Sequence, residues 1–317
     1  MQPDVTFIIA AFNAEGTIER AIKSALAQHG VSVEVVVADD RSSDRTAAIA
    51  GSFPNEQVRV LTLESNRGPG GARNAALDVA KGRWIAVLDS DDTVLPDRIA
   101  PMITRAANAR AKAAVDNIEV VREGKVGRET MFPAHHLARI PEITLADFIA
   151  SNVVFKSAFN FGYMKPIFER RFIETHGLRY EENLRIGEDY TFLASILAKG
   201  GKCVVEPSVG YAYHVRPGSV SRVLEMHHIT SMLEADKRFI ESFELNAEAR
   251  AAQARRTRSL EQAKSFLALV DHIKRRSISG IIEVAVRNPV AFRHLSMPIG
   301  VRLKRLIPSA TSQSKDW

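Results

Sequence analysis

The sequence has little cysteine and lacks any long hydrophobic run. Its 317 residues include one cysteine, Cys203, which excludes an intramolecular disulfide and a zinc site made of several cysteines. No stretch of about 18 uncharged apolar residues occurs, so we predict no membrane-spanning helix. The first residues carry Asp4 where a signal peptide would carry a basic residue, and the apolar stretch that follows is short. We therefore expect a cytoplasmic location, with peripheral contact at the cytoplasmic face of a membrane left open.

Charge is unevenly placed along the chain. Residues 222–317 hold 17 basic and 10 acidic residues, whereas residues 1–221 hold 26 basic and 27 acidic, so the net charge of +6 belongs to the C-terminal third. The composition changes at the same point to long polar segments that are rich in Ala, Arg and Glu. We therefore predict two units, residues 1–221 and a basic helical region over residues 222–317.

The segment 250–305 leaves two interpretations open. It contains 13 basic and 3 acidic residues interleaved with apolar ones, a pattern typical of helices that lie on anionic lipid. A solvated helical surface that packs on the first unit explains the same charges. We expect no binding to nucleic acid, because the segment has few aromatic side chains on which bases could stack.

Apolar runs alternate with helical patterns in the first unit. Strands are predicted over 5–9, 33–38, 58–63 and 84–88, and helices over 18–26, 71–80 and a short segment from Asp44. Later predictions are helices over 96–110, 145–150, 171–177 and 188–199, and strands over 113–121, 125–132 and 203–205. The alternation predicts a doubly wound α/β fold, in which ligands bind beyond the carboxyl ends of the strands.

Three acids directly follow the strand predicted over 84–88. Asp89, Asp91 and Asp92 have a spacing that can bring two carboxylates to one divalent cation. Mg²⁺ and Mn²⁺ favour such oxygen ligands together with substrate phosphates, which indicates a nucleotide diphosphate substrate. A polar turn that merely ends the strand is the alternative, although three neighbouring acids repel one another unless a cation compensates.

Other polar residues fall at predicted strand ends and turns. Asp39 can accept a hydrogen bond from a base or ribose, while Asp44 is better placed to cap a helix. The glycine-rich turn over 65–74 is either a phosphate cradle with Arg73 as its charge partner or plain turn punctuation.

Two further groups lie in the second half of the first unit. Glu188 and Asp189 open a predicted helix, where an ionised aspartate can act as a general base or simply cap the helix. His214 is a candidate metal ligand, although a lone histidine is more often structural. Arg216 is a candidate phosphate contact.

Taken in chain order, five segments resemble the motifs of the family 2 glycosyltransferases, which are inverting enzymes with the GT-A fold. They are IIAAFNAE (8–15), DDRSSD (39–44), GARN (71–74), LDSDD (88–92) and GED (187–189). Each motif alone is weak, but their order and spacing are specific. The resemblance covers about residues 4–221 and implies a GT-A, Rossmann-like α/β sheet with flanking helices.

On the donor side, the resemblance implies contacts with a nucleotide. Phe12 would stack near the base, with Glu15 in the same motif, Asp39 would contact the base, and Arg73 would lie near the nucleotide. Three departures fall in these motifs: Ala10 and Ala11 replace the usual Pro and its neighbour, Phe12 replaces the commoner Tyr, and Arg41 replaces the usual Gly.

The resemblance also assigns the catalytic side. Asp91, with Asp89 and Asp92, would hold the donor diphosphate through Mg²⁺ or Mn²⁺, which is the family's DXD metal motif. Asp189 would be the catalytic base, with Glu188 beside it at the acceptor.

The resemblance thus implies metal-dependent, inverting transfer from a nucleotide sugar, expected to be a UDP-sugar. The acceptor would be a hydroxyl of a glycan or a lipid-linked saccharide, in cell-surface or exopolysaccharide synthesis. The Q-x-x-R-W motif of processive synthases does not occur, which indicates a non-processive enzyme.

Two alternatives remain beside this function. A nucleotidyltransferase would share the sheet, but its glycine-rich, lysine-bearing opening is missing from this sequence. The non-enzymatic alternative is a scaffold protein with a degenerate site that binds nucleotide sugars or associates with a membrane, and intact Asp91 and Asp189 argue against it.

Overall fold

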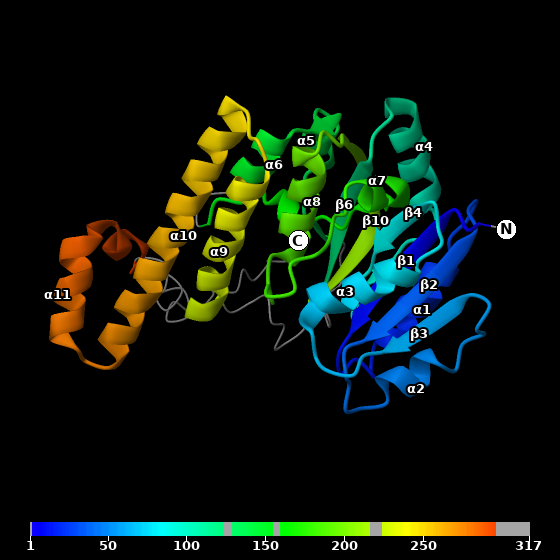
Figure 1. The fold of residues 1–317 in the computed structure, drawn as a ribbon, viewed down its shortest axis with the longest axis horizontal. Coiled ribbons are helices and arrows are strands. Elements are labelled where there is room, and N and C mark those ends of the chain that lie inside the picture. The colour runs from blue at the N-terminus through cyan, green and yellow to red at the C-terminus, as the bar shows by residue number, and fades with distance from the viewer. Residues whose placement is uncertain (1, 123–128, 155–158, 216–223, 296–317) are drawn as a thin grey trace, which may run out of the picture.

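The computed structural model describes residues 2–122, 129–154, 159–215 and 224–295. Within these residues, one mixed sheet has the strand order β3-β2-β1-β4-β9-β6-β10-β5, with β7 beside β6 and β8 beside β10 (Figure 1). The strands are β1 (Val5–Ala11), β2 (Val33–Asp39), β3 (Val58–Thr62), β4 (Trp84–Val87), β5 (Thr93–Val94), β6 (Ala113–Arg122), β7 (Glu129–Thr130), β8 (Glu142–Ile143), β9 (Ile167–Glu169) and β10 (Cys203–Val215).

Helices pack against this sheet and extend beyond it. They are α1 (Ile18–Leu26), α2 (Thr46–Ala50), α3 (Gly68–Val79), α4 (Ile99–Ala109), α5 (Ala134–Leu137), α6 (Leu145–Ser151), α7 (Arg170–Thr175), α8 (Glu188–Ala198), α9 (Met226–Ser242), α10 (Ala247–Lys274) and α11 (Ile278–Arg287). The GT-A-like α/β architecture predicted from the sequence is confirmed.

Strands β1 to β4 run parallel, and the largely apolar sequences of β1, β2 and β4 follow from burial on both faces, whereas the edge strand β3 is partly exposed. The chain moves outward from β1 to β2 and β3, then returns to β4 on the other side of β1. Such a reversal opens a crevice at the carboxyl ends of the strands. Ala11 pairs with Asp39 in register, so the ends of β1 and β2 reach the same edge of the sheet as the residues that follow β4.

The second half of the sheet brings a later segment to the same edge. β9 lies antiparallel between β4 and β6, and β10 runs parallel to β6. Near its end, β10 also pairs with the short strand β5, where Tyr211 lies opposite Val94. The residues between β4 and β5 are therefore held against the end of β10.

Helix α8 begins at the predicted residue, Glu188, and ends at Ala198, one residue before the predicted end, but its surroundings differ from the prediction. The sequence predicts an amphipathic helix over 188–199, whereas none of the residues of α8 is exposed. Its Phe192 stacks on Tyr180 with ring centroids 4.0 Å apart, and its Tyr190 stacks on Phe148 at 5.2 Å. The prediction that α8 has an exposed face is wrong, because segments before and after α8 in the chain both pack on it.

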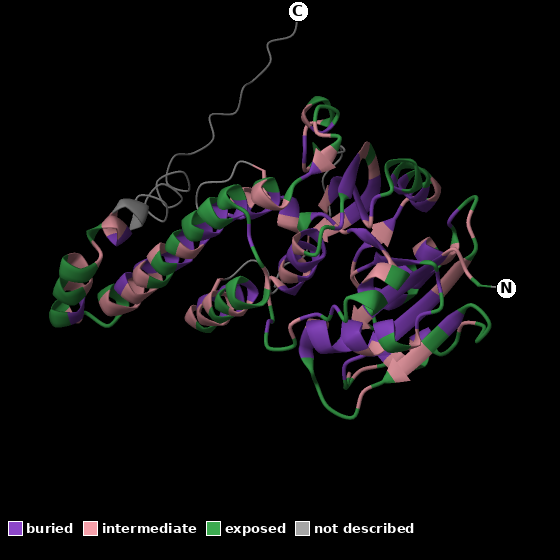
Figure 2. Cartoon of the chain, turned by 45° about the horizontal axis from the view of Figure 1, so that its top comes forward, coloured by how far each residue is buried: buried purple, intermediate pink, exposed green. Residues whose placement is uncertain are grey.

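The C-terminal helices share the main hydrophobic core. Phe239, Leu245, Ala249 and Ala252 belong to the same buried cluster as the central strands, and α10 packs along α6 and α9. Helix α11 lies at the end of the molecule farthest from β1 to β3 and is largely exposed, whereas the central strands β1, β2 and β4 are mostly buried (Figures 1 and 2). The predicted division at residue 221 falls outside the described residues and stays a prediction.

A buried ion pair fixes α10 to α8 and α9. Arg256 Nε lies 3.1 Å from Asp236 Oδ1, Arg256 Nη1 donates to the carbonyl oxygen of Asn152 at 3.0 Å, and the guanidinium carbon lies 3.8 Å from the ring centroid of Tyr190. Tyr190 directly follows Asp189, so this contact also supports the start of α8.

We predict that Arg256→Ala lowers the free energy of unfolding by about 3–5 kcal/mol, because it leaves the buried carboxylate of Asp236 without its partner. Urea unfolding at pH 7 measures the change. Arg255→Ala is the matched control, since Arg255 is exposed on the same helix and should change stability by no more than about 0.5 kcal/mol. Equal effects of the two variants would contradict the prediction.

Candidate active site

Segments far apart in the sequence supply one group of charged side chains, the acidic cluster, at the carboxyl edge of the sheet. Arg73 comes from α3, Asp89 follows β4, and Glu188 and Asp189 open α8. Arg73 donates from Nη2 to Asp89 Oδ1 at 2.7 Å and from Nη1 to Glu188 Oε1 at 2.5 Å, and Nη1 lies 3.1 Å from Asp189 Oδ1. The structure thus brings together four of the residues predicted from sequence.

Lys165 completes the cluster and was not predicted. It lies two residues before Ile167, the first residue of β9, which is the short strand between β4 and β6. Its Nζ lies 2.7 Å from Asp89 Oδ2 and 2.7 Å from Asp189 Oδ2. The surrounding sequence, from about 133 to 187, has a mixed pattern that gives no sign of a site. Only the pairing of β9 with β4 carries Lys165 to the edge where the acids lie.

The cluster sets the protonation of its own members. Burial raises the pKa of Asp89, but Lys165 and Arg73 outweigh burial and lower it to about 2. Burial lowers the pKa of Lys165, yet the carboxylates of Asp189 and Asp89 hold it above its ordinary value. Burial and the neighbouring Asp189 raise the pKa of Glu188. Asp89 is therefore an ionised oxygen donor at neutral pH.

Helix α8 begins at a glycine with an unusual backbone conformation. Gly187, which caps the helix, has φ +93°, a left-handed conformation that side chains disfavour. The following Glu188 and Asp189 lie in the first turn, where the helix dipole stabilises negative charge. The turn before α8 needs a glycine at position 187, and this turn lets Glu188 and Asp189 face Arg73.

Asp92 and His214 make other contacts. Both oxygens of Asp92 accept hydrogen bonds, one from the Tyr211 hydroxyl at 2.7 Å and one from the His214 backbone N–H at 2.8 Å. Burial and the charges of Asp89 and Asp91 raise the pKa of Asp92 to about 8. The His214 ring nitrogen Nε2 lies 3.0 Å from Thr93 Oγ1. These contacts tie β10 to the loop after β4, and metal binding by Asp92 or His214 stays a prediction.

On the donor side, Phe12 follows β1 and Asp39 is the last residue of the neighbouring strand β2. Phe12 is 53% exposed, which leaves its ring open to a stacking partner. Asp39 is buried; its Oδ2 accepts a hydrogen bond from the Ser42 N–H at 3.2 Å, whereas its buried Oδ1 accepts none in the structure as described. A buried acceptor of this kind calls for a partner, and the N–H of a nucleotide base is a chemically suitable one.

Glu15 instead contacts the segment before α2. Its Oε2 accepts hydrogen bonds from the backbone N–H and the Nε of Arg45, at 3.1 and 3.2 Å. Asp44 accepts from the Glu15 N–H at 3.0 Å and from the Thr46 N–H at 2.9 Å, which agrees with the capping interpretation of Asp44. Contact of Glu15 with a nucleotide stays a prediction.

The departure at Arg41 has a local cost. Arg41 has φ +67°, a conformation that glycine adopts more readily, which accounts for the glycine usual in the resembling motif. Its side chain donates to the carbonyl oxygen of Glu64 at 2.7 Å. The strained turn is thus braced from the loop after β3.

The start of α3 is only partly open to a phosphate. The backbone N–H groups of Arg67 and Gly68 donate to the carboxylate of Asp40, at 2.6 and 2.8 Å. These two N–H groups already have an acceptor, so for them the interpretation of the turn over 65–74 as a phosphate cradle is wrong. Arg73, one turn later, keeps its place at the acidic cluster.

The residues present fit a divalent cation shared with a substrate. Asp89 and Asp91 offer hard carboxylate oxygens, which Mg²⁺ and Mn²⁺ prefer. Among the described residues, no three His, Cys, Asp or Glu side chains form a metal cage. Nucleotide-bound Mg²⁺ usually takes one or two carboxylates and completes its shell with phosphates and water, so the pair suffices. Arg216, the predicted phosphate contact, lies outside the described residues.

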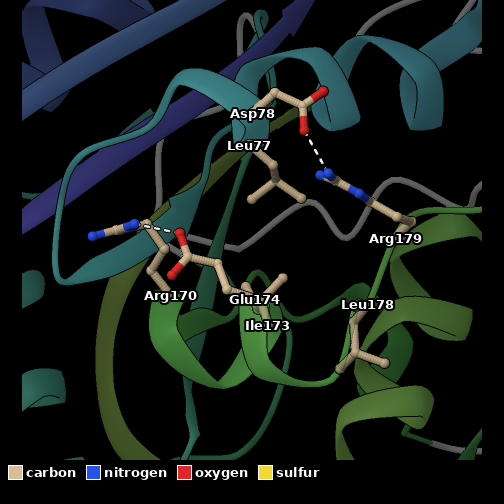
Figure 3. Close-up of a pocket in the computed structure, with 8 residues that line it drawn as sticks. Leu77, Asp78, Arg170, Ile173, Glu174, Leu178 and Arg179 are labelled. Atoms are coloured by element: carbon tan, nitrogen blue, oxygen red, sulfur yellow. Dashed lines mark hydrogen bonds and ion pairs between the residues drawn. The ribbon is translucent and has the colours of Figure 1, made fainter.

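A pocket of about 260 Å³ lies between the end of α3, α7 and the loop after α7 (Figure 3). Its lining shares no residue with the acidic cluster. Asp78 pairs with Arg179 at 2.5 Å, and Arg170 pairs with Glu174, so the opposite charges in the lining neutralise each other. Nothing in this pocket favours an anionic sugar nucleotide.

Solved structures define the class of fold. Staphylococcus aureus TarS, residues 1–349, superposes with a TM-score of 0.61 at 20% identity over 85% of this chain and 74% of that chain. Mannosyltransferase PcManGT from Pyrobaculum calidifontis, solved with GDP-Man and Mn²⁺, gives a TM-score of 0.60 at 18% identity over 92% of this chain and 81% of that chain. These likenesses and the acidic edge of the sheet define a GT-A glycosyltransferase fold.

Sequence comparison specifies the family. Residues 6–172 match the profile of glycosyl transferase family 2. The chain is 57% identical over 305 residues to the succinoglycan biosynthesis protein ExoO of Rhizobium meliloti, which covers 96% of this chain and 87% of the relative. It is 30% identical over 217 residues to an Escherichia coli beta-1,3-glucosyltransferase, WfaP, over 68% of this chain and 79% of the relative. The chain belongs to glycosyl transferase family 2 and is a glycosyltransferase.

Proposed function

We propose that this chain transfers a sugar, with inversion and with help from Mg²⁺ or Mn²⁺, from a UDP-sugar to a hydroxyl of a glycan or lipid-linked saccharide during exopolysaccharide synthesis. One observation carries the proposal: Arg73 joins Asp89, at the metal motif, to Glu188 and Asp189, at the start of α8, in one partly buried cluster. This contact supports a reaction in which the metal-bound donor and the base act side by side.

The relatives support the classes of donor and acceptor. The printed name of the Escherichia coli relative WfaP gives UDP-Glc as its donor and a GlcNAc-diphosphoundecaprenol as its acceptor. The Rhizobium meliloti relative is named for succinoglycan biosynthesis. By this likeness we assign this chain a UDP-sugar donor and an acceptor on a lipid-linked or growing polysaccharide, at the cytoplasmic face of the membrane.

The proposed reaction is a single displacement at the anomeric carbon. Asp189 accepts the proton of the acceptor hydroxyl while that oxygen bonds to the anomeric carbon, and the bond from this carbon to the diphosphate breaks. Asp189 Oδ1 lies 3.1 Å from Arg73 Nη1 in an ion pair but accepts no hydrogen bond in the described structure, so it keeps an acceptor position for this proton. Asp89 and Asp91 would hold a divalent cation, which supplies Lewis-acid stabilisation of the departing diphosphate.

The other site residues orient the reactants. Phe12 would stack on the base, and Asp39 Oδ1 would accept a hydrogen bond from it. Arg73 keeps Asp89 and the acids of α8 at fixed spacing. Glu188, whose Oε1 accepts from Arg73 at 2.5 Å, holds α8 at the acceptor side.

A donor panel tests the proposal. Purified protein is mixed with UDP-, GDP- and dTDP-sugars and Mn²⁺ or Mg²⁺, and thermal shift and nucleoside diphosphate release are measured with and without EDTA. We expect UDP-sugars to raise the unfolding temperature and to release UDP, and EDTA to remove both effects. Stabilisation by another nucleotide class would overturn the donor assignment. Nucleoside diphosphate release that EDTA does not affect would overturn the proposed metal dependence.

We further propose that the segment 250–305 contacts an anionic membrane. On α11, Ile278, Ile282 and Val286 are 73%, 58% and 78% exposed and follow one another at four-residue spacing, which puts them on one face. Lys274 and Arg276 are exposed just before this helix. Apolar side chains flanked by basic ones are suited to the headgroup region of anionic lipid. In the part of the chain that the structure describes, no helix is long and apolar enough to cross a membrane.

Changing Ile278 and Ile282 together to Asp should reduce binding to vesicles that contain phosphatidylglycerol at least about fivefold, because the change removes apolar contact and adds repulsion. Co-sedimentation measures binding, with phosphatidylcholine vesicles as the neutral reference. Ile240→Asp is the control, since Ile240 is 47% exposed on α9. Undiminished binding of the double variant would show that α11 is not the contact.

A further inference from the structure

Lys165 lies between Asp89, the proposed metal ligand on the donor side, and Asp189, the proposed base. Its Nζ lies 2.7 Å from Asp89 Oδ2 and 2.7 Å from Asp189 Oδ2, so one ammonium joins the proposed metal ligand to the proposed base. Its side chain is 12% exposed. A buried cation with two carboxylate partners is a strong ionic contact that the proposed reaction does not use.

The two carboxylates and two cations form a closed ring. Arg73 lies 2.7 Å from Asp89 Oδ1 and 3.1 Å from Asp189 Oδ1, while Lys165 faces the second oxygen of each acid. Every oxygen of Asp89 and Asp189 thus has a cationic nitrogen within 3.1 Å. A divalent cation that binds Asp89 must displace one of these nitrogens or share its oxygen.

Lys165 is the easier of the two cations to displace. Arg73 also holds Glu188 and forms its contacts through two nitrogens of a rigid planar group. Lys165 offers one nitrogen at the end of a flexible chain, so its contact with Asp89 can break while Arg73 keeps the acids in place.

We propose that Lys165 occupies the metal position of Asp89 in the donor-free protein, competes with the divalent cation for that carboxylate, and, because it also holds Asp189, links metal binding to release of the base. The inference rests on the proposed metal-dependent function and extends it to a residue with no assigned role. Its consequence is that removal of Lys165 tightens metal binding while it harms the coupled reaction.

The test measures metal affinity in the absence of donor. Mn²⁺ is titrated into the full chain, and the electron paramagnetic resonance signal of free Mn²⁺ gives the dissociation constant. Lys165→Met should bind Mn²⁺ about tenfold more tightly than the wild type, within the usual range of coupling between competing ligands. Lys165→Arg restores the charge and should bind close to the wild type. Lys165→Gln is the second neutral variant, should the methionine variant fold poorly.

Matched controls separate competition from a structural effect. Lys112→Met removes an ion pair of similar length, 2.6 Å to Glu169, away from the acidic cluster, and should leave Mn²⁺ affinity unchanged. Adding Asp89→Asn to Lys165→Met should cancel the gain. Affinity of Lys165→Met and Lys165→Gln equal to or weaker than the wild type would overturn the inference and leave the metal site standing. The titration is repeated with UDP present, because the proposed cation shares its ligands with the diphosphate. Failure of every variant to bind Mn²⁺ both alone and with UDP would overturn both the inference and the metal dependence, while metal-free UDP release would still show transfer chemistry.

Discussion

Asp189→Asn is expected to lower kcat for sugar transfer by roughly 10³-fold, because an amide cannot accept the proton of the acceptor hydroxyl. The change keeps the size of the side chain, so the donor site at Asp89 should survive. Donor affinity, measured by calorimetry with UDP and Mn²⁺, should stay within about threefold of the wild type.

Glu188→Gln serves as the comparison for this variant. Glu188 accepts a hydrogen bond from Arg73 at 2.5 Å, and the amide oxygen of glutamine can still accept it, so the loss should be smaller than for Asp189→Asn. If Asp189→Asn lost nucleotide binding and kept its turnover of bound donor, the assignment of Asp189 as the base would be wrong.

Arg73→Lys should have the second largest effect, a loss in kcat/KM of at least about 10²-fold. Arg73 reaches Asp89 from Nη2 and the acids of α8 from Nη1, and a lysine has only one nitrogen with which to span them. The variant leaves buried carboxylates without a hydrogen bond, which should also lower the free energy of unfolding by about 1–3 kcal/mol. Steady-state kinetics and urea unfolding measure the two losses.

Arg179→Lys is the matched control for Arg73→Lys. Arg179 pairs with Asp78 at 2.5 Å, but both side chains are about half exposed and lie outside the acidic cluster. Its effect on stability should remain below about 1 kcal/mol, and kcat/KM should not change. Similar losses for the two variants would mean that Arg73 contributes only as an ordinary ion pair.

The parallel half of the fold could be predicted from sequence because its central strands β1, β2 and β4 are largely buried on both faces. Such strands are continuous apolar runs, and the helix after each one has its own period. The central pairing of β4 with β9 could not be predicted, because β9 has only three residues and Phe168 lies 83 positions after its partner Ile85 in the chain. A pairing that short leaves no periodic signal.

The residues of the site likewise separate into those that the sequence could predict and those that it could not. Asp39 and Asp89 come at the ends of recognisable strands and Asp189 opens a recognisable helix, so the sequence could predict that they lie at one edge of the sheet. Lys165 lies before β9 and reaches the cluster only through the unpredicted pairing. The hydrogen bonds of Asp92 likewise depend on β10 continuing to Val215, well past the strand predicted over 203–205.

The burial of α8 and the packing of α10 against α6 and α9 also could not be predicted from sequence patterns. Helical period alone shows that residues of one face are apolar, but it does not show how many neighbours cover the helix. Arg256 has the sequence appearance of one more charge on a basic helix, yet it is buried against Tyr190 and Asp236. Its role follows from tertiary packing.

The most direct test of the account is to locate the metal and the diphosphate. Crystals grown with UDP and Mn²⁺ can be measured at the manganese absorption edge, where anomalous scattering marks the ion. The account predicts one strong peak within ligand distance of a carboxylate of Asp89 or Asp91, next to the diphosphate and with Asp189 facing the same space. A diphosphate bound away from these acids, or manganese bound elsewhere in the protein, would contradict it.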